Sequence, residues 1–174
     1  MRAIRYHEHG SLDVLTEEDV PKPEPEADEV LVEIRASSVN PVDVYLREGE
    51  THVPEALPVT PGSDFAGIVA SVGSKVTEFS PGDRVLGAGL SFAQQGTNAE
   101  YVSPSTDLVA HLPDEVGFAE GAAIGHVGVT AWASVIQLGS PDPLDTVLIH
   151  GGSGGIGHVA VQLAKLASAD VVTT

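Results

Sequence analysis

The sequence predicts a mixed α/β protein, in which a β-rich segment is followed by a single strand–helix–strand unit. Over about the first two-thirds of the 174 residues, short apolar runs alternate with proline- and glycine-containing turns. From about Glu120 the chain becomes rich in Ala, Val and Ile. A glycine loop at residues 151–157 then separates an apolar run from a helical repeat. The change of pattern predicts one domain at residues 1–120 and a second at 121–174.

Five short apolar runs in the first part are predicted as strands because turn signals such as Pro61-Gly62 and Pro81-Gly82-Asp83 bound them. They are residues 2–6, 30–36, 66–72, 84–86 and 100–102. A short helix is predicted over residues 41–47, since Asn40 can cap it and Pro41 suits the first helical position.

The second part predicts a helix over residues 120–137, a strand at 146–150, a helix at 156–166 and a strand at 171–174. Strand, glycine loop, helix and strand form one βαβ unit. In a doubly wound sheet the first strand has neighbours on both sides, and here one neighbour is absent from the sequence. We therefore expect a truncated domain, either a fragment of a longer polypeptide or one whose open edge a partner covers.

Composition excludes several kinds of protein. The absence of cysteine excludes disulfides, thiol nucleophiles and cysteine-based metal centres. The net charge of −17 disfavours nucleic acid and anionic membranes as partners, and no run approaches 18 apolar residues. The polar amino terminus is not a secretory signal, so we expect a cytoplasmic protein. The acid excess fits either an ordinary acidic surface or a halophilic proteome, and we favour the second.

The glycine loop contains the pattern GxGxxG at Gly152, Gly154 and Gly157. Between a strand and a helix, this pattern indicates a dinucleotide site whose pyrophosphate meets backbone N–H groups. The alternatives are a glycine-rich turn without a ligand, or a loop that has lost one. An acid at the end of the second strand would favour NADH, and Thr173 and Thr174 are not acids. This favours NADPH, with NADH as the weaker candidate, and the residue that decides between them lies at Thr174 or just after it.

Several motifs together resemble those of the zeta-crystallin-like quinone oxidoreductases, in the zinc-free branch of the medium-chain dehydrogenase/reductase superfamily. They are Met1-Arg2-Ala3-Ile4, Val39-Asn40-Pro41-Val42-Asp43, Pro61-Gly62-Ser63-Asp64-Phe65-Ala66-Gly67, Phe79-Ser80-Pro81-Gly82-Asp83-Arg84-Val85, Thr130-Ala131-Trp132 and the glycine loop. The resemblance covers the amino-terminal portion of such enzymes. It implies a GroES-like β-barrel catalytic domain, followed by the first βαβ unit of a Rossmann domain.

The resemblance also implies the site residues. Asn40 and Tyr45 would lie near the nicotinamide and the substrate as catalytic residues. The cofactor-binding residues would be Asn40, Thr130, Ser153, Gly154, Gly155 and Ile156. Each polar side chain has a structural alternative: Asn40 as a helix cap, Tyr45 as a half-buried aromatic, and Thr130 as a hydroxyl bonded to its own helix.

Departures from the zinc-dependent relatives predict that the site holds no metal. Asn40 stands where those enzymes have Cys, and Gly62-Ser63-Asp64 stands where they have Gly-His-Glu. Asn and Ser are poor zinc ligands. Members of the family often carry a second tyrosine about six residues after the first, and this chain has Thr51-His52 there.

The sequence therefore predicts an NADPH-dependent, zinc-independent reductase of quinones or related conjugated carbonyls. An enoyl or alkene reductase of the same superfamily is one alternative, and a catalytically silent binding or structural module is another. For a full-length protein we expect a homodimer that acts on a small quinone or enone.

Overall fold

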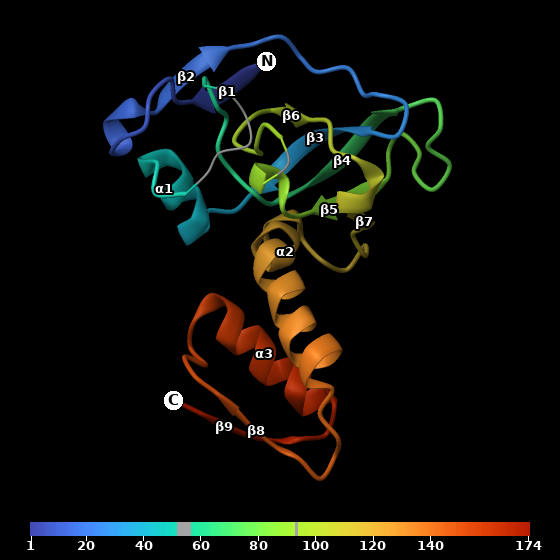
Figure 1. Cartoon of the computed structure of the whole chain (residues 1–174). Coiled ribbons are helices and arrows are strands. Elements are labelled where there is room, and N and C mark those ends of the chain that lie inside the picture. Colours follow the sequence, from blue (N-terminus) through green and yellow to red (C-terminus); the bar gives the residue numbers. More distant parts are fainter. Residues whose placement is uncertain (52–56, 93) are drawn as a thin grey trace. The chain divides into compact units, whose positions relative to one another are not determined.

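The computed structural model describes residues 1–51, 57–92 and 94–174 (Figure 1). Its internal contacts divide the chain into two compact units, Met1–Gly125 and His126–Thr174. The first unit is built mainly from antiparallel strands, and the second contains a parallel strand pair with a helix. The predicted mixed α/β class is confirmed.

An antiparallel sheet of five strands, in the order β6-β3-β4-β5-β7, forms the centre of the first unit. The strands are β3 (Val30–Ser37), β4 (Phe65–Val72), β5 (Arg84–Gly87), β6 (Tyr101–Val102) and β7 (Val109–His111). Its buried core consists of Val30, Val32, Phe65, Val69, Phe79, Val85, Leu90 and Val102. The predicted strands of this sheet are confirmed, whereas β7 was missed because a run of only three residues carries no periodicity.

A second antiparallel pair joins β1 (Arg2–Arg5) to β2 (Thr16–Asp19). The sequence did not predict β2, because Thr-Glu-Glu-Asp offers no apolar residue. Its charged side chains instead face arginines of β1, with Arg5 Nη1 3.6 Å from Glu18 Oε2. Short 3₁₀ turns lie at Leu12–Val14, Leu90–Phe92 and Thr106–Leu108.

The predicted short helix is α1 (Pro41–Glu48). It begins after Asn40, whose backbone N–H donates to Asp43 Oδ2 at 2.8 Å. Gly49 ends it in the left-handed conformation at φ 77°, which glycine adopts at no steric cost. These two local signals fix both ends of the helix that carries Tyr45.

The predicted long helix is α2 (Phe118–Trp132), which continues as π-helix over Ala133–Gly139. Together they form a helix of 22 residues with a window of mean hydropathy 1.2, of which 28% is buried. Among the described residues it alone has the length and composition of a membrane span, although the sequence predicted no such run. Core helices of soluble proteins pass the same test, so this is weak evidence for a span.

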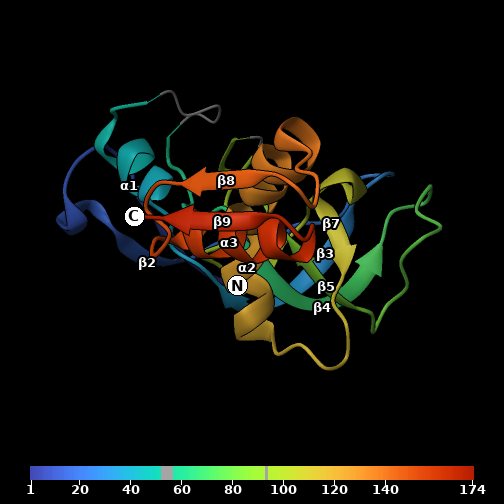
Figure 2. The same ribbon diagram turned by 90° about the horizontal axis from the view of Figure 1, so that it is seen from below.

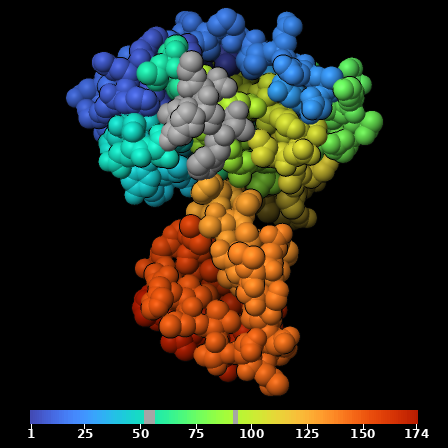
Figure 3. Space-filling model, in the orientation of Figure 1, coloured from blue at the N-terminus to red at the C-terminus, as the bar shows by residue number. Residues whose placement is uncertain are grey.

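The βαβ unit consists of β8 (Thr146–Ile149), α3 (Gly155–Leu166) and β9 (Asp170–Thr173). The two strands run parallel, side by side, as Figure 2 shows. The core that joins them to the helices is formed by Ala131, Val135, Val159, Ala160 and Ala164. In the space-filling view the side chains of this unit, orange to red, pack into one continuous body (Figure 3). Within the described residues β8 pairs only with β9, as the sequence predicted.

Candidate functional site

The glycine loop forms a tight turn between β8 and α3. Gly151 has φ 70°, in the left-handed region. A Cβ atom on Gly152 would collide with the Thr173 hydroxyl, and one on Gly157 would collide with the Gly151 carbonyl oxygen. A Cβ on Gly154, in contrast, would meet only that same oxygen, at 3.3 Å. Packing within the chain therefore demands two of the motif's glycines but not Gly154.

Gly154 is the residue that precedes α3. Its N–H donates to Gly151 O at 2.9 Å, and its carbonyl accepts the first helical bond, from His158 N at 3.0 Å. The N–H groups of residues 155–157 thus have no acceptor within the helix, and no side chain that the structure describes caps this end. Ser153, Gly154, Gly155 and Ile156 are all exposed here. The structure brings these four predicted residues together at the positive end of a helix, a favourable place for an anion.

The end of β9 lies beside this loop. Gly152 N donates to Thr174 O at 3.1 Å, and Thr174 Oγ1 lies 3.4 Å from His150 Nδ1. Asp170 is at the opposite end of β9, where it pairs with Thr146 and its carboxylate lies 3.9 Å from Lys165 Nζ. The side chain that ends the second strand is therefore a hydroxyl, and the acid is at the strand's start.

Thr130 lies in α2, where its hydroxyl donates to His126 O at 2.9 Å. This is the local helix bond that the sequence analysis gave as the structural alternative. A hydroxyl that donates to its own backbone can still accept a hydrogen bond. Contact of Thr130 with a cofactor stays a prediction.

Asn40 is 6% exposed and holds the turn between β3 and α1. Its amide Nδ2 donates to Asp64 Oδ2 at 2.9 Å and to Ser38 Oγ at 3.3 Å. Ser38 Oγ in turn donates to Asp64 Oδ2 at 2.7 Å. Asn40 is thus both the residue before α1 and a member of a polar cluster. Ser38 was not predicted from the sequence, because nothing in its spacing distinguishes it from Ser37.

Tyr45 lies in α1 with 49% of its surface exposed. The buried tyrosine of this unit is Tyr6, and burial raises the pKa of its phenol, with the Asp43 carboxylate raising that pKa further. Tyr6 therefore stays neutral at physiological pH. Tyr45 is the tyrosine of the two that a ligand can reach.

Asn40 and Ser63, which stand where the zinc-dependent relatives have Cys and His, are both engaged in hydrogen bonds. Ser63 is fully buried and its Oγ accepts a hydrogen bond from Gly89 N at 3.2 Å. Over residues 1–51, 57–92 and 94–174 no three His, Asp or Glu side chains gather as a metal site would need. Thr51 is described, and its neighbour His52 lies outside the described residues.

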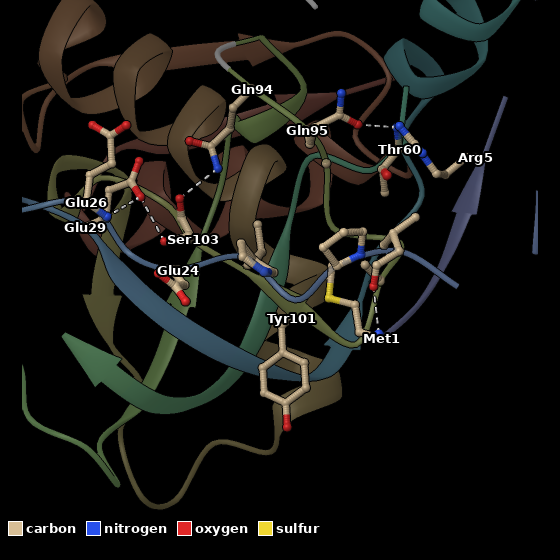
Figure 4. Close-up of a pocket in the computed structure, with 16 residues that line it drawn as sticks. Met1, Arg5, Glu24, Glu26, Glu29, Thr60, Gln94, Gln95, Tyr101 and Ser103 are labelled. Carbon is tan, nitrogen blue, oxygen red and sulfur yellow. Dashed lines mark hydrogen bonds between the residues drawn. The ribbon is translucent and has the colours of Figure 1, made fainter. Parts of the chain in front are cut away.

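A cavity of about 400 Å³ lies elsewhere in the first unit (Figure 4). Neither Asn40 nor Tyr45 lines it. Gln94 Nε2 donates to Ser103 O at 3.0 Å, and Thr60 N donates to Gln95 Oε1 at 2.7 Å. These hydrogen bonds join neighbouring loops, so the residues of the cavity wall have a structural role.

The model of the alcohol dehydrogenase GroES-like domain matches residues 26–114. A quinone oxidoreductase of Lama guanicoe is 40% identical over 175 residues, which is 100% of this chain and 52% of the relative. The chain spans about half the length of the curated relatives it matches. The resemblance predicted from the motifs is thus confirmed.

Solved structures show the same similarity. An Escherichia coli quinone oxidoreductase complexed with NADPH matches with a TM-score of 0.89 and 31% identity, over 99% of this chain and 52% of that one. The CurK enoyl reductase also matches with a TM-score of 0.89, at 28% identity over 99% of this chain and 53% of that one. The similarity therefore extends over both units of the chain.

Proposed function

Because the chain belongs to the family of alcohol dehydrogenase GroES-like domains, we propose that it is the amino-terminal part of an NADPH-dependent, zinc-independent reductase of quinones or related conjugated carbonyls. The observation that carries this proposal is the exposed turn at Gly154. The N–H groups of residues 155–157 come before the first helical hydrogen bond of α3 there, and Gly154 leaves room for a ligand to approach the backbone.

The fit of a dinucleotide rests on this loop. Ser153, Gly154, Gly155 and Ile156 would hold the pyrophosphate through backbone N–H groups and the helix dipole. Thr174 and His150, without a carboxylate between them, favour a 2′-phosphate over a free ribose hydroxyl, and hence NADPH over NADH. When bound, the cofactor supplies a hydride.

The barrel would supply the acceptor's side of the site. Asn40 and Tyr45 would lie by the nicotinamide and the substrate, with Thr130 near the cofactor, to orient the two reactants and exclude water. A quinone needs little acid catalysis, because its ring stabilises the reduced oxygens and solvent can supply protons. Zinc independence is supported by Ser63 and Asn40, both engaged in internal hydrogen bonds.

The proposal extends to the setting of the full-length protein. For the full-length protein we infer a cytoplasmic homodimer. We also infer that it binds neither nucleic acid nor an anionic membrane, since the net charge of −17 on this chain repels phosphate groups. The same acid excess supports a halophilic source.

An enoyl reductase is the second candidate, favoured by the similarity to the CurK enoyl reductase. A panel of quinones and enones, assayed with NADPH and with NADH, separates the two. We expect faster quinone reduction, and faster reduction with NADPH. Faster enone reduction would instead show that the protein is an enoyl reductase. NADPH binding without turnover of either class would point to a silent binding module.

A further inference from the structure

A buried carboxylate lies directly behind Asn40. Asp64 precedes β4, is 1% exposed, and accepts hydrogen bonds from Asn40 Nδ2 and Ser38 Oγ on the same oxygen, Oδ2. Its backbone carbonyl also accepts a bond from Ser38 N at 3.4 Å. Asp64 thus joins the end of β3 to the start of β4 at the point where the chain turns into α1.

The hydrogen atoms of this cluster can be counted. The Asn40 amide nitrogen carries two hydrogens, and it has two acceptors, Asp64 Oδ2 at 2.9 Å and Ser38 Oγ at 3.3 Å. Ser38 gives its single hydroxyl hydrogen to Asp64, so it can only accept from Asn40. Both amide hydrogens are therefore used in hydrogen bonds within the first unit. A flipped amide would place its carbonyl oxygen against the carboxylate, which is repulsive.

The other side of the carboxylate is closed by α2. A Cβ atom on Gly125 would lie 3.1 Å from Asp64 Cγ and 3.3 Å from its Oδ1. Oδ1 is buried and, among the residues that the structure describes, it has no hydrogen-bond partner. Leaving a buried carboxylate oxygen unpaired destabilises the fold. A carboxyl group held at this cost, with its other oxygen bonded to Asn40 and Ser38, points to a role beyond packing.

We propose that Asp64 is a positioning residue that locks the Asn40 amide, so that Oδ1, which also faces the Asp43 N–H in the capping box of α1, is the only side-chain atom of Asn40 that can still accept a hydrogen bond from a ligand. Asn40 then recognises a hydrogen-bond donor, such as a hydroxyl or N–H of the cofactor, and does not donate to the carbonyl oxygen of the acceptor. The identity of this ligand rests on the proposed function, whereas the locked amide does not.

Nuclear magnetic resonance tests the lock directly. The chain has two asparagines, Asn40 and Asn98, so the side-chain amides of a ¹⁵N-labelled sample are readily assigned with Asn40→Asp. We expect both Asn40 amide hydrogens to exchange with water about tenfold or more slowly compared with those of an open amide, and Asp64→Ala, which removes the acceptor, to abolish this protection. Equal exchange in the two proteins would overturn the proposal.

Glu29→Ala is the matched control, because the Glu29 carboxylate also accepts one serine hydroxyl and one N–H. It should leave the Asn40 exchange unchanged, and an equal effect of both variants would contradict a specific lock. Should Asp64→Ala fail to fold, Ser38→Ala decides. Ser38→Ala removes one of the two acceptors, so one of the two Asn40 amide hydrogens should exchange faster. Unchanged exchange of both hydrogens would refute the proposal.

An NADPH titration tests the ligand part. Asp64→Ala should weaken NADPH binding about tenfold, and Glu29→Ala should not. If the Asp64 variant frees the Asn40 amide but binds NADPH with unchanged affinity, the ligand assignment is wrong. If the unaltered chain binds no NADPH, the proposed function fails at this site, while the exchange measurement still decides whether Asp64 locks Asn40.

Discussion

Gly157, in the first turn of α3, faces the backbone of Gly151 so closely that a side chain has no room between them. A Cβ atom there would overlap the Gly151 carbonyl oxygen and lie 2.9 Å from Gly152 Cα. Since the obstacle is backbone on two consecutive residues, no side-chain rotation relieves it. The approach of the helix to the loop therefore depends on this glycine.

Gly157→Ala is expected to destabilise the second unit by roughly 1–3 kcal/mol, the range for overpacking in a tight site. Urea unfolding, followed by far-ultraviolet circular dichroism, measures the loss. Gly154→Ala is the matched control in the same loop, because its Cβ would lie 3.3 Å from the nearest atom. Equal losses for the two variants would contradict the described packing.

Substitutions of Gly154 should instead affect the cofactor. Gly154→Ala keeps the fold but places a methyl group where the pyrophosphate approaches the backbone, and Gly154→Asp adds a charge that repels it. We expect about tenfold weaker NADPH binding for Ala and no measurable binding for Asp, by fluorescence titration. An affinity unchanged in Gly154→Asp would show that the pyrophosphate binds elsewhere.

Acid should weaken the first unit through its carboxylates. Hydrogen bonds from His7 and Thr16 lower the pKa of Glu18, and those from Arg2 lower the pKa of Glu100. Because these pKa values are lower in the folded than in the unfolded chain, their stabilisation is present above about pH 4.5 and is lost as the pH falls through the folded values.

Glu100→Gln should therefore flatten the acid limb of the free energy of unfolding, measured by urea titration between about pH 3 and 7. Glu8→Gln, at an exposed position, removes the same charge as a control. A limb equally steep in Glu100→Gln and in the unaltered chain would refute the role assigned to the Arg2–Glu100 pair.

Salt should stabilise the protein. At a net charge of −17 the carboxylates repel one another, and ions screen this repulsion in the folded state. We expect the midpoint of thermal unfolding at pH 7 to rise between about 0.1 M and 2 M KCl. The rise should shrink near the isoelectric point of about 4.5. A midpoint independent of salt at pH 7 would contradict the electrostatic reading of the composition.

Local signals predicted most of this fold. Asn40 and Pro41 mark the start of α1, and the glycine loop marks the turn into α3, because both are set by residues adjacent in sequence. In contrast, β2 has no apolar residue and forms only because β1 lies beside it. Such a strand depends on a contact between distant segments, which periodicity does not record.

The candidate site divides in the same way. The exposure of residues 153–156 follows from the loop pattern, whereas the bonds from Asn40 and Ser38 to Asp64 join the ends of two strands. No spacing rule relates Asn40 to a residue 24 positions later. The Thr130 hydroxyl shows the reverse case, since its bond to His126 is the local alternative that helix geometry already offered.

The central claim is that the loop at the start of α3 binds the diphosphate of NADPH. A titration of the ¹⁵N-labelled chain with NADPH, followed through its backbone amide resonances, tests this most directly. The account predicts that the largest shifts fall on Ser153, Gly154, Gly155 and Ile156. Shifts centred on Gln94, Gln95 and Ser103, around the cavity of Figure 4, would contradict it, as would the absence of any shift in the loop.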